Sequence, residues 1–279
     1  MTAILGGLGA ACCWAAATLC SSRSSRQIGA ASVLAGVMLV GLVLVAPFVV
    51  AIGSPPEGAT VAWLILAGAG NVLGLLLEYA GLRVGKVGIV AAIASTEGAV
   101  AAVLSAIAGE SIPGVTAGAL ALIAGGVVLA SLGTNDGNRD GRAGRAVPFA
   151  VGAALAFGVS LYAAGRVSGD VAMTWVLLPA RLVGVLFVAI PLSMRGRLRI
   201  TRRSAPLVAA AGICEVVGFA SFILGARDAV GVASVLASQF AAFAAVGAFF
   251  FFGERLRRVQ VAGVGTILVG VALLALLRT

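Results

Sequence analysis

Runs of about 20 apolar residues recur along the whole chain, and they restrict its fold more than any other feature does. A helix of about that length crosses the ~30 Å hydrocarbon core of a bilayer. Hydrophobic residues make up 61% of the 279 residues and charged residues 10%, whereas soluble domains average about 45–50% and about 25%. So few charges cannot cover a surface that faces water. The sequence therefore predicts an all-α integral membrane protein.

The apolar runs predict ten transmembrane helices. The first run begins at once, without a basic leader or a clear cleavage site, so we expect it to be retained as a helix. A polar loop with Arg23 and Arg26 is expected after it. The predicted helices cover about residues 2–20, 30–52, 59–81, 87–109, 113–132, 147–165, 170–193, 205–225, 229–252 and 259–277.

The chain also contains an internal repeat. Residues 71–128 align without a gap on residues 215–272, at an offset of 144. Gly109-Glu110 then falls on Gly253-Glu254. Each copy holds five predicted helices, and an odd number makes the second copy enter the membrane upside down relative to the first. The sequence predicts two inverted five-helix repeats, an arrangement that places a site at the repeat interface near the membrane midplane.

The boundaries of the repeats follow from one polar segment, which is rich in Gly, Asp and Arg and is the only real linker. The predicted units are a first repeat at 1–133, a linker at 134–146 and a second repeat at 147–279.

The net charge of +9 comes mostly from basic residues in the short loops. They form no stripe with interleaved aromatic residues, so we do not expect nucleic-acid binding. Loops rich in Arg and Lys tend to stay in the cytoplasm. With the loops numbered in order, only Arg166, Arg227 and Arg278 lie on the even-numbered side. The charges therefore predict odd-numbered loops in the cytoplasm and both termini outside, in a prokaryotic-type plasma (inner) membrane.

Short motifs occupy equivalent places in both halves. The first half has Tyr79-Ala80-Gly81-Leu82-Arg83 and later Gly109-Glu110; the second has Gly225-Ala226-Arg227 and Phe252-Gly253-Glu254-Arg255. Their paired placement resembles the EamA-type proteins of the drug/metabolite transporter superfamily over nearly the whole chain. The resemblance implies a carrier of metabolites or drugs that works by alternating access, commonly in export. It also implies both termini in the cytoplasm, against the loop charges.

The sequence departs from this family at two places. Members often have a proline midway along the helix before each Gly-Glu pair. Here those positions read Ser95-Thr96-Glu97 and Ser238-Gln239-Phe240. The residues therefore offer no proline on which a kink could rest.

Ionisable side chains inside a predicted helix are costly in a bilayer, at about 2.5–3.5 kcal/mol each, so they are candidates for function. Glu97, Glu215 and Arg181 fall near the middle of helices, whereas Glu78 falls nearer an end, from which it could snorkel to the interface. Asn71 is the repeat mate of Glu215. A central site would use Glu97 and Glu215 to bind a cationic substrate or to exchange protons. The alternative is that Arg181 pairs permanently with one of them and holds two helices together.

Other candidates are aromatic or lie in loops. Trp14 and Tyr162 are in helices that the repeat makes equivalent, and both are candidates for lining the cavity. Glu110 and Glu254 end helices, and we expect them to fix the turns of the Gly-Glu motif.

The leading hypothesis is a secondary active transporter that exports a small metabolite or drug, with a central site between the repeats and proton coupling left open. The sequence lacks a Gly-x-x-x-x-Gly-Lys-Ser/Thr loop, so ATP is not expected to drive it directly, and neither a metal nor a cofactor is expected. A membrane-embedded lipid-modifying enzyme and a channel are the alternatives, although the chain has no His and no rings of like residues. The expected partners are a small-molecule substrate and the lipid bilayer; a monomer suffices, and a dimer is left open.

Overall fold

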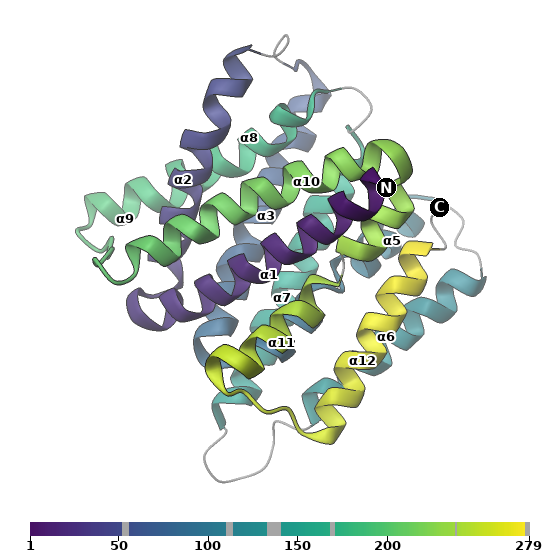
Figure 1. Cartoon of the computed structure of the whole chain (residues 1–279). Helices are drawn as coiled ribbons and strands as arrows, with labels where there is room; N and C mark the ends of the chain where they lie inside the picture. Colours follow the sequence, from purple (N-terminus) through teal and green to yellow (C-terminus); the bar gives the residue numbers. More distant parts are fainter. Residues whose placement is uncertain (52–55, 110–113, 133–140, 168–170, 238, 277–279) are drawn as a thin grey trace.

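The structure is a computed structural model that describes residues 1–51, 56–109, 114–132, 141–167, 171–237 and 239–276. In these residues every regular element is a helix (Figure 1). The helices are α1 (Thr2–Ile28), α2 (Ala30–Ala51), α3 (Ala59–Val84), α4 (Val87–Ala94), α5 (Glu97–Ile107), α6 (Gly114–Leu132), α7 (Gly141–Gly165), α8 (Met173–Gly184), the π-helical segment η1 (Val185–Ala189), α9 (Ile190–Met194), α10 (Ala205–Ala237), α11 (Phe240–Phe252) and α12 (Arg258–Leu276).

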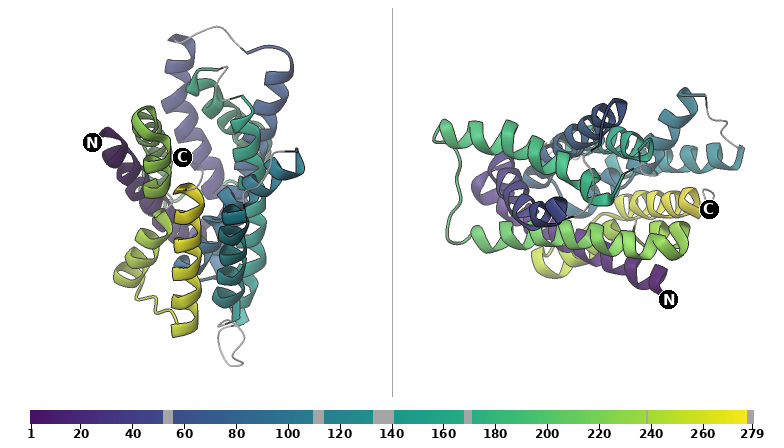
Figure 2. Two further views of the ribbon diagram at one scale, coloured as in Figure 1. Left: turned by 90° about the vertical axis from the view of Figure 1, so that its right-hand side faces the viewer. Right: turned by 90° about the horizontal axis from the view of Figure 1, so that it is seen from above.

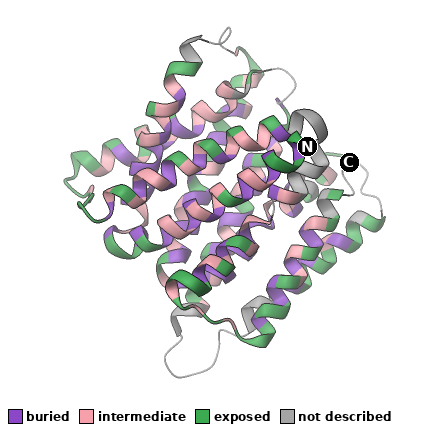
Figure 3. Ribbon diagram, viewed as in Figure 1, coloured by how far each residue is buried: buried purple, intermediate pink, exposed green. Residues whose placement is uncertain are grey.

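The apolar segments of the structure coincide with the ten predicted runs. Within the described residues, seven helical stretches are long and apolar enough to cross a membrane. Three shorter apolar stretches lie at Ala117–Val127, Phe240–Phe252 and Arg258–Leu273, inside the remaining predicted runs. Exposed residues occur along the outside of the bundle (Figure 3), and many of them are apolar, including Phe187, Phe250 and Phe251, which are largely exposed. Such a surface suits lipid rather than water.

Helices of the first half pack mainly against helices of the second half. The most extensive contacts join α1 with α10, α3 with α7, and α6 with α12 (Figures 1 and 2). The α3–α7 pair is the repeat mate of the α1–α10 pair, because an offset of about 144 converts one into the other. The two halves are therefore interleaved rather than set side by side.

Matched glycine contacts make the repeat visible in the packing of α6 and α12. A Cβ atom added at Gly126 would lie 2.8 Å from Ile267, and one added at Gly270 would lie 2.7 Å from Ile123. Each of these residues lies 144 positions from its mate. Small residues allow such close helix contact in lipid, where no hydrophobic effect drives helices together.

The first helix is longer than predicted. The loop predicted after residue 20 is wrong, because α1 continues to Ile28, and Gly29, at a φ of 86°, ends it. The polar residues stay helical since they are buried: Ser21, Ser22, Ser24 and Ser25 have no exposed surface. The polarity of these serines suggested a loop, whereas their spacing along the sequence is compatible with a helix.

Two helices are broken where the sequence offers no proline. One predicted helix is divided into α4 and α5 at Ser95 and Thr96, whose hydroxyls donate hydrogen bonds to the carbonyls of Ala92 and Ile93, 2.8 and 2.7 Å away. These bonds to residues three positions back tighten the turn and compete with the helical pattern. The break between α10 and α11, at Gln239, is its repeat mate.

Three further predicted boundaries differ. The turn predicted near residue 227 is helical, because α10 runs on to Ala237 with no proline after Pro206 to interrupt it. Residues 141–146, predicted as linker, form the first turns of α7. The helix predicted at 170–193 is divided by η1, and π-helical turns of this kind are frequent at functional sites.

Candidate functional site

Three carboxylates from both halves of the chain meet inside the bundle. Glu78 comes from α3, Glu97 from α5 and Glu215 from α10; Glu78 is 6% exposed and Glu215 is 9% exposed, whereas Glu97 is half-buried. Glu78 lies within electrostatic range of both others, and Glu97 within range of Glu215. The interface snorkelling considered for Glu78 is wrong, because α3 continues past it to Val84 and its side chain points inward.

Arg181 lies in this cluster and is 2% exposed. Its Nη2 is 3.9 Å from Glu215 Oε2, a separation longer than a hydrogen bond, and its Nη1 contacts Met38 Sδ at 3.6 Å. Among the described residues, its Nε has no hydrogen-bond partner. Gly41 makes room for the side chain, since a Cβ there would lie 2.8 Å from that Nε. The guanidinium therefore keeps donor capacity for another acceptor.

Charge balance follows from this arrangement. In the described part of the chain, Arg181 is the one cation found in electrostatic contact with this cluster, and its contact is with Glu215. One guanidinium compensates one carboxylate at most. Uncompensated charge is costly out of water, so the other two carboxyl groups need protons or a bound cation.

The helix break positions Glu97. Glu97 was predicted at mid-helix, but it is the first residue of α5, directly after the turn at Ser95 and Thr96. A carboxylate at a helix N-terminus interacts favourably with the helix dipole and with unpaired backbone N–H groups. Next to it, a Cβ at Gly98 would meet no atom within 4 Å, so the backbone is open on that side.

Aromatic rings line the adjoining wall. Trp14 of α1 contacts Phe219, Phe222 and Phe240, with ring centroids 5.2, 6.2 and 6.3 Å away. Gly218 leaves the space for the indole, whose Nε1 is buried and has no hydrogen-bond partner in the part of the chain that the structure describes. One helical turn along α1, the Thr18 hydroxyl donates to Glu78 at 3.5 Å. The aromatic wall and the acidic cluster are therefore contiguous.

Tyr162 and Asn71 lie farther along the bundle. Tyr162 makes an edge-to-face contact with Trp63, with ring centroids 6.0 Å apart. The guanidinium of Arg166 lies over the Trp63 ring, 5.7 Å from its centroid. Asn71 is seven residues before Glu78 on the same face of α3, about 10 Å away along the helix axis. A cavity of about 520 Å³ between α5 and α7 is lined by Gly98, Ala101, Ser105, Leu161, Tyr162, Gly165 and Arg166. The cavity is lined by Arg166, at the even-loop end of α7, and by Gly98, the residue after Glu97.

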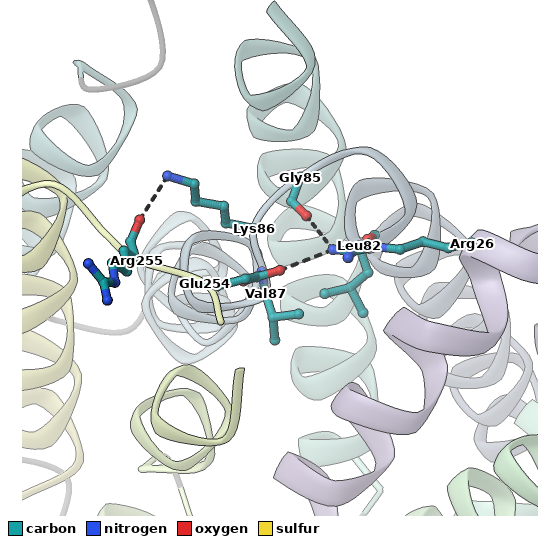
Figure 4. Close-up of polar contacts among 7 residues, drawn as sticks. All are labelled: Arg26, Leu82, Gly85, Lys86, Val87, Glu254 and Arg255. Carbon is teal, nitrogen blue, oxygen red and sulfur yellow. Dashed lines mark hydrogen bonds and ion pairs between the residues drawn. The ribbon is translucent and has the colours of Figure 1, made fainter. Parts of the chain in front are cut away.

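At the opposite, odd-loop end, polar contacts join α1 to the loop after α11 and to the start of α4 (Figure 4), beside a cavity of about 530 Å³ lined by Arg26, Arg83, Val84 and Arg145. Glu254 pairs with Arg26 at 3.1 Å, and its other oxygen accepts the backbone N–H of Val87, the first residue of α4, at 2.7 Å. Arg26 also donates to the carbonyls of Leu82 and Gly85. We call these contacts of Arg26 and Glu254 the odd-side lock. Glu110, the repeat mate of Glu254, lies outside the described residues.

Several residues of the acidic cluster and of the odd-side lock were not predicted from the sequence. Thr18, Tyr79, Met38 and Arg26 join the cluster or the lock, although none was singled out. Thr18 could have been found, because Thr18, Ser21, Ser22 and Ser25 repeat at helical spacing. The others depend on contacts between segments far apart in the chain.

Buried carboxylates between two interleaved, repeated halves of a membrane-spanning bundle are typical of secondary transporters. The family comparison agrees: residues 1–132 and 144–276 match the EamA-like transporter family. The chain belongs to that family, which confirms both the resemblance and the predicted fold class, a multi-pass membrane protein of ten helices in two inverted repeats.

The chain was also compared with solved structures and with curated proteins. A solved structure, described only as a crystal structure of a protein, superposes with a TM-score of 0.67 at 16% identity, over 99% of this chain and 96% of that one. At this identity the likeness shows the fold alone. No curated protein matches the chain.

Proposed function

We propose that this member of a transporter family moves a small cationic or zwitterionic metabolite or drug by alternating access, through a central site formed by Glu78, Glu97, Glu215 and Arg181. The observation that carries the proposal is the excess of carboxylates over cations in a buried cluster built from both halves. A cationic substrate and protons are alternative ways to balance the same charge. Exchange of one for the other would couple transport to a proton gradient.

Each side chain has a part in this proposal. Glu97, at the helix break beside Gly98, receives the substrate amine. Arg181, loosely paired with Glu215, binds an anionic group of a zwitterion through its unused donors. Trp14 and its neighbouring rings contact the apolar part, and a cation also gains from the face of an aromatic ring. Tyr162 lines the approach from the even-loop end, and Asn71 the wall between them.

Direction and orientation belong to the same proposal. The loop charges favour the odd-numbered loops in the cytoplasm, so the closed lock would face the cytoplasm and the α5–α7 cavity the outside. Proton exchange in that arrangement supports export. One chain contains the whole cluster, so a monomer is sufficient for transport.

The test is flux in proteoliposomes. A panel of amines, amino acids, nucleosides and sugars is assayed with and without a pH gradient, for wild type, Glu97→Gln and Glu215→Gln. We expect a cationic or zwitterionic compound to move, and at least one substitution to abolish gradient-driven uptake while counterflow persists. Counterflow also separates a carrier from a channel. Wild-type transport by both variants would make the carboxylates structural and refute the site.

A further inference from the structure

We infer that one face of α1, formed by Thr18, Ser21, Ser22 and Ser25, is a second, hydroxyl-lined part of the substrate path, which binds water and the polar groups of the substrate when the odd-loop end opens. The inference rests on the proposed alternating access. It adds four side chains beyond the central carboxylates and assigns the odd-side lock as their barrier.

The four hydroxyls share one face of the helix. Their spacing, i, i+3, i+4 and i+7, places them within an arc of about 100°, in line with Trp14 of the aromatic wall. The stripe begins at Glu78, to which Thr18 donates, and ends beside Arg26 of the lock. It therefore spans the distance from the central cluster to the closed end.

Two hydroxyls of this stripe are not satisfied within the described residues. Ser22 and Ser25 have no exposed surface, and their Oγ atoms have no hydrogen-bond partner in the part of the chain that the structure describes. Ser21, equally buried, lies toward the buried hydroxyl of Tyr79, which is next to Glu78 in sequence. Buried polar groups without partners are rare and unfavourable. If this face of α1 served packing alone, Ala would avoid the cost of burying unpaired hydroxyls, and Ala is plentiful elsewhere in α1.

Ser24 differs from Ser22 and Ser25 in its hydrogen bonding. It is buried as completely as Ser22, but its Oγ donates to the carbonyls of Cys20 and Ser21, at 2.7 and 3.3 Å. Two residues along a helix are about 200° apart, so Ser24 lies nearly opposite Ser22. The stripe alone keeps hydrogen-bonding capacity in reserve.

The lock explains why the stripe is closed in this conformation. Glu254 belongs to the loop between α11 and α12. It pairs with Arg26, near the end of α1, and accepts a hydrogen bond from the start of α4. The ion pair thus links the two halves of the chain across the end of the stripe. Losing it lets the α11–α12 loop move away from α1, and water then reaches the hydroxyls.

The test measures accessibility of single cysteines rather than transport. The four native cysteines, all free, are replaced by Ala, and Ser22→Cys or Ser24→Cys is added. A membrane-impermeant thiosulfonate reagent is applied to right-side-out and inside-out vesicles. We expect slow labelling of Ser22→Cys from the odd-loop side, and at least a tenfold faster rate when Glu254→Gln breaks the ion pair. Ser24→Cys, the matched control, should stay slow in both backgrounds.

Glu254→Gln retains an oxygen to accept the Val87 N–H, and Arg26→Gln removes the same ion pair if the first variant is not monodisperse. Equal rates at positions 22 and 24, or an unchanged rate at position 22 in both lock variants, would overturn the inference. Neither result depends on substrate identity or on which carboxyl group carries protons. A failed flux assay would refute the central site and leave the labelling result standing.

Discussion

Arg181 combines deep burial with a loose ion pair. It is almost fully buried between α2, α8 and α10, and its contact with Glu215 is too long for a hydrogen bond. A permanent structural pair would close that gap, because buried ion pairs offset their desolvation only with close geometry and further hydrogen bonds. The loose pairing leaves donors of the Arg181 guanidinium available for the substrate proposed above.

Replacing Arg181 alone should therefore be harmful in a diagnostic way. Arg181→Met leaves Glu215 without its cation, and removing one partner of a buried pair costs about 3–5 kcal/mol. We expect a marked fall in the thermal midpoint in detergent. The double variant Arg181→Met with Glu215→Gln should recover most of that loss, because no unpaired charge remains. If the double variant is no more stable than the single one, the two residues do not form an energetically coupled pair.

The sequence predicted that Glu97 and Glu215 are candidates for a site, and it predicted their positions in the helices less well. Glu97 and Glu215 were chosen because charges are expensive in lipid, and the structure places both in one buried cluster with Arg181 and Glu78. The mid-helix position predicted for Glu97 was wrong because hydroxyl side chains, rather than proline, break the helix. Local hydrogen bonds of Ser and Thr to the backbone carry no distinctive sequence signal.

At the scale of elements, the α6–α12 pair gives a clear contrast between neighbouring glycines. A Cβ at Gly126 would lie 2.8 Å from the backbone nitrogen of Ile267 and 3.0 Å from the carbonyl oxygen of Gly263, whereas one at Gly125 would meet nothing within 4 Å. Backbone cannot move aside as a flexible side chain can. The close approach of the two helices therefore requires glycine at one position and not at the next.

The paired substitutions test this packing. We expect Gly126→Ala to destabilise the protein by about 1–3 kcal/mol through overpacking. Gly125→Ala should be neutral or stabilising, because Ala is about 1 kcal/mol more favourable than Gly inside a helix. Thermal unfolding followed by circular dichroism compares the two. Equal midpoints for both variants would show that α6 and α12 do not pack as described.

Within the described residues, the two ends of the molecule differ in their contacts although the sequence is duplicated. At the odd-loop end, Glu254 pairs with Arg26 beside a cavity of about 530 Å³; toward the even-loop end, a cavity of about 520 Å³ lies between α5 and α7. Inverted repeats allow two halves to exchange conformations, and the alternating access proposed above would use that exchange.

Orientation is testable at this scale. If the odd-numbered loops are cytoplasmic, Arg166→Cys should react with an impermeant maleimide on intact cells, and Arg197→Cys should react only after permeabilisation. Both arginines are exposed, in an even-numbered and an odd-numbered loop respectively. Their labelling in a background without native cysteines decides between the orientation from loop charge and the one that the family resemblance implies. The reverse pattern would place both termini in the cytoplasm.

The sequence by itself determined the class of molecule. Apolar runs long enough to cross a bilayer leave the chain no soluble alternative, and the gap-free offset of 144 residues predicts the inverted repeat. Only the tertiary structure decided which residues meet: Glu78 with Glu97 and Glu215, Arg26 with Glu254, and Trp14 with Gly218. The reason is physical. Burial in lipid is a property of each segment and is visible locally, whereas a contact depends on how α1, α3, α8 and α10 pack together, which no single segment encodes.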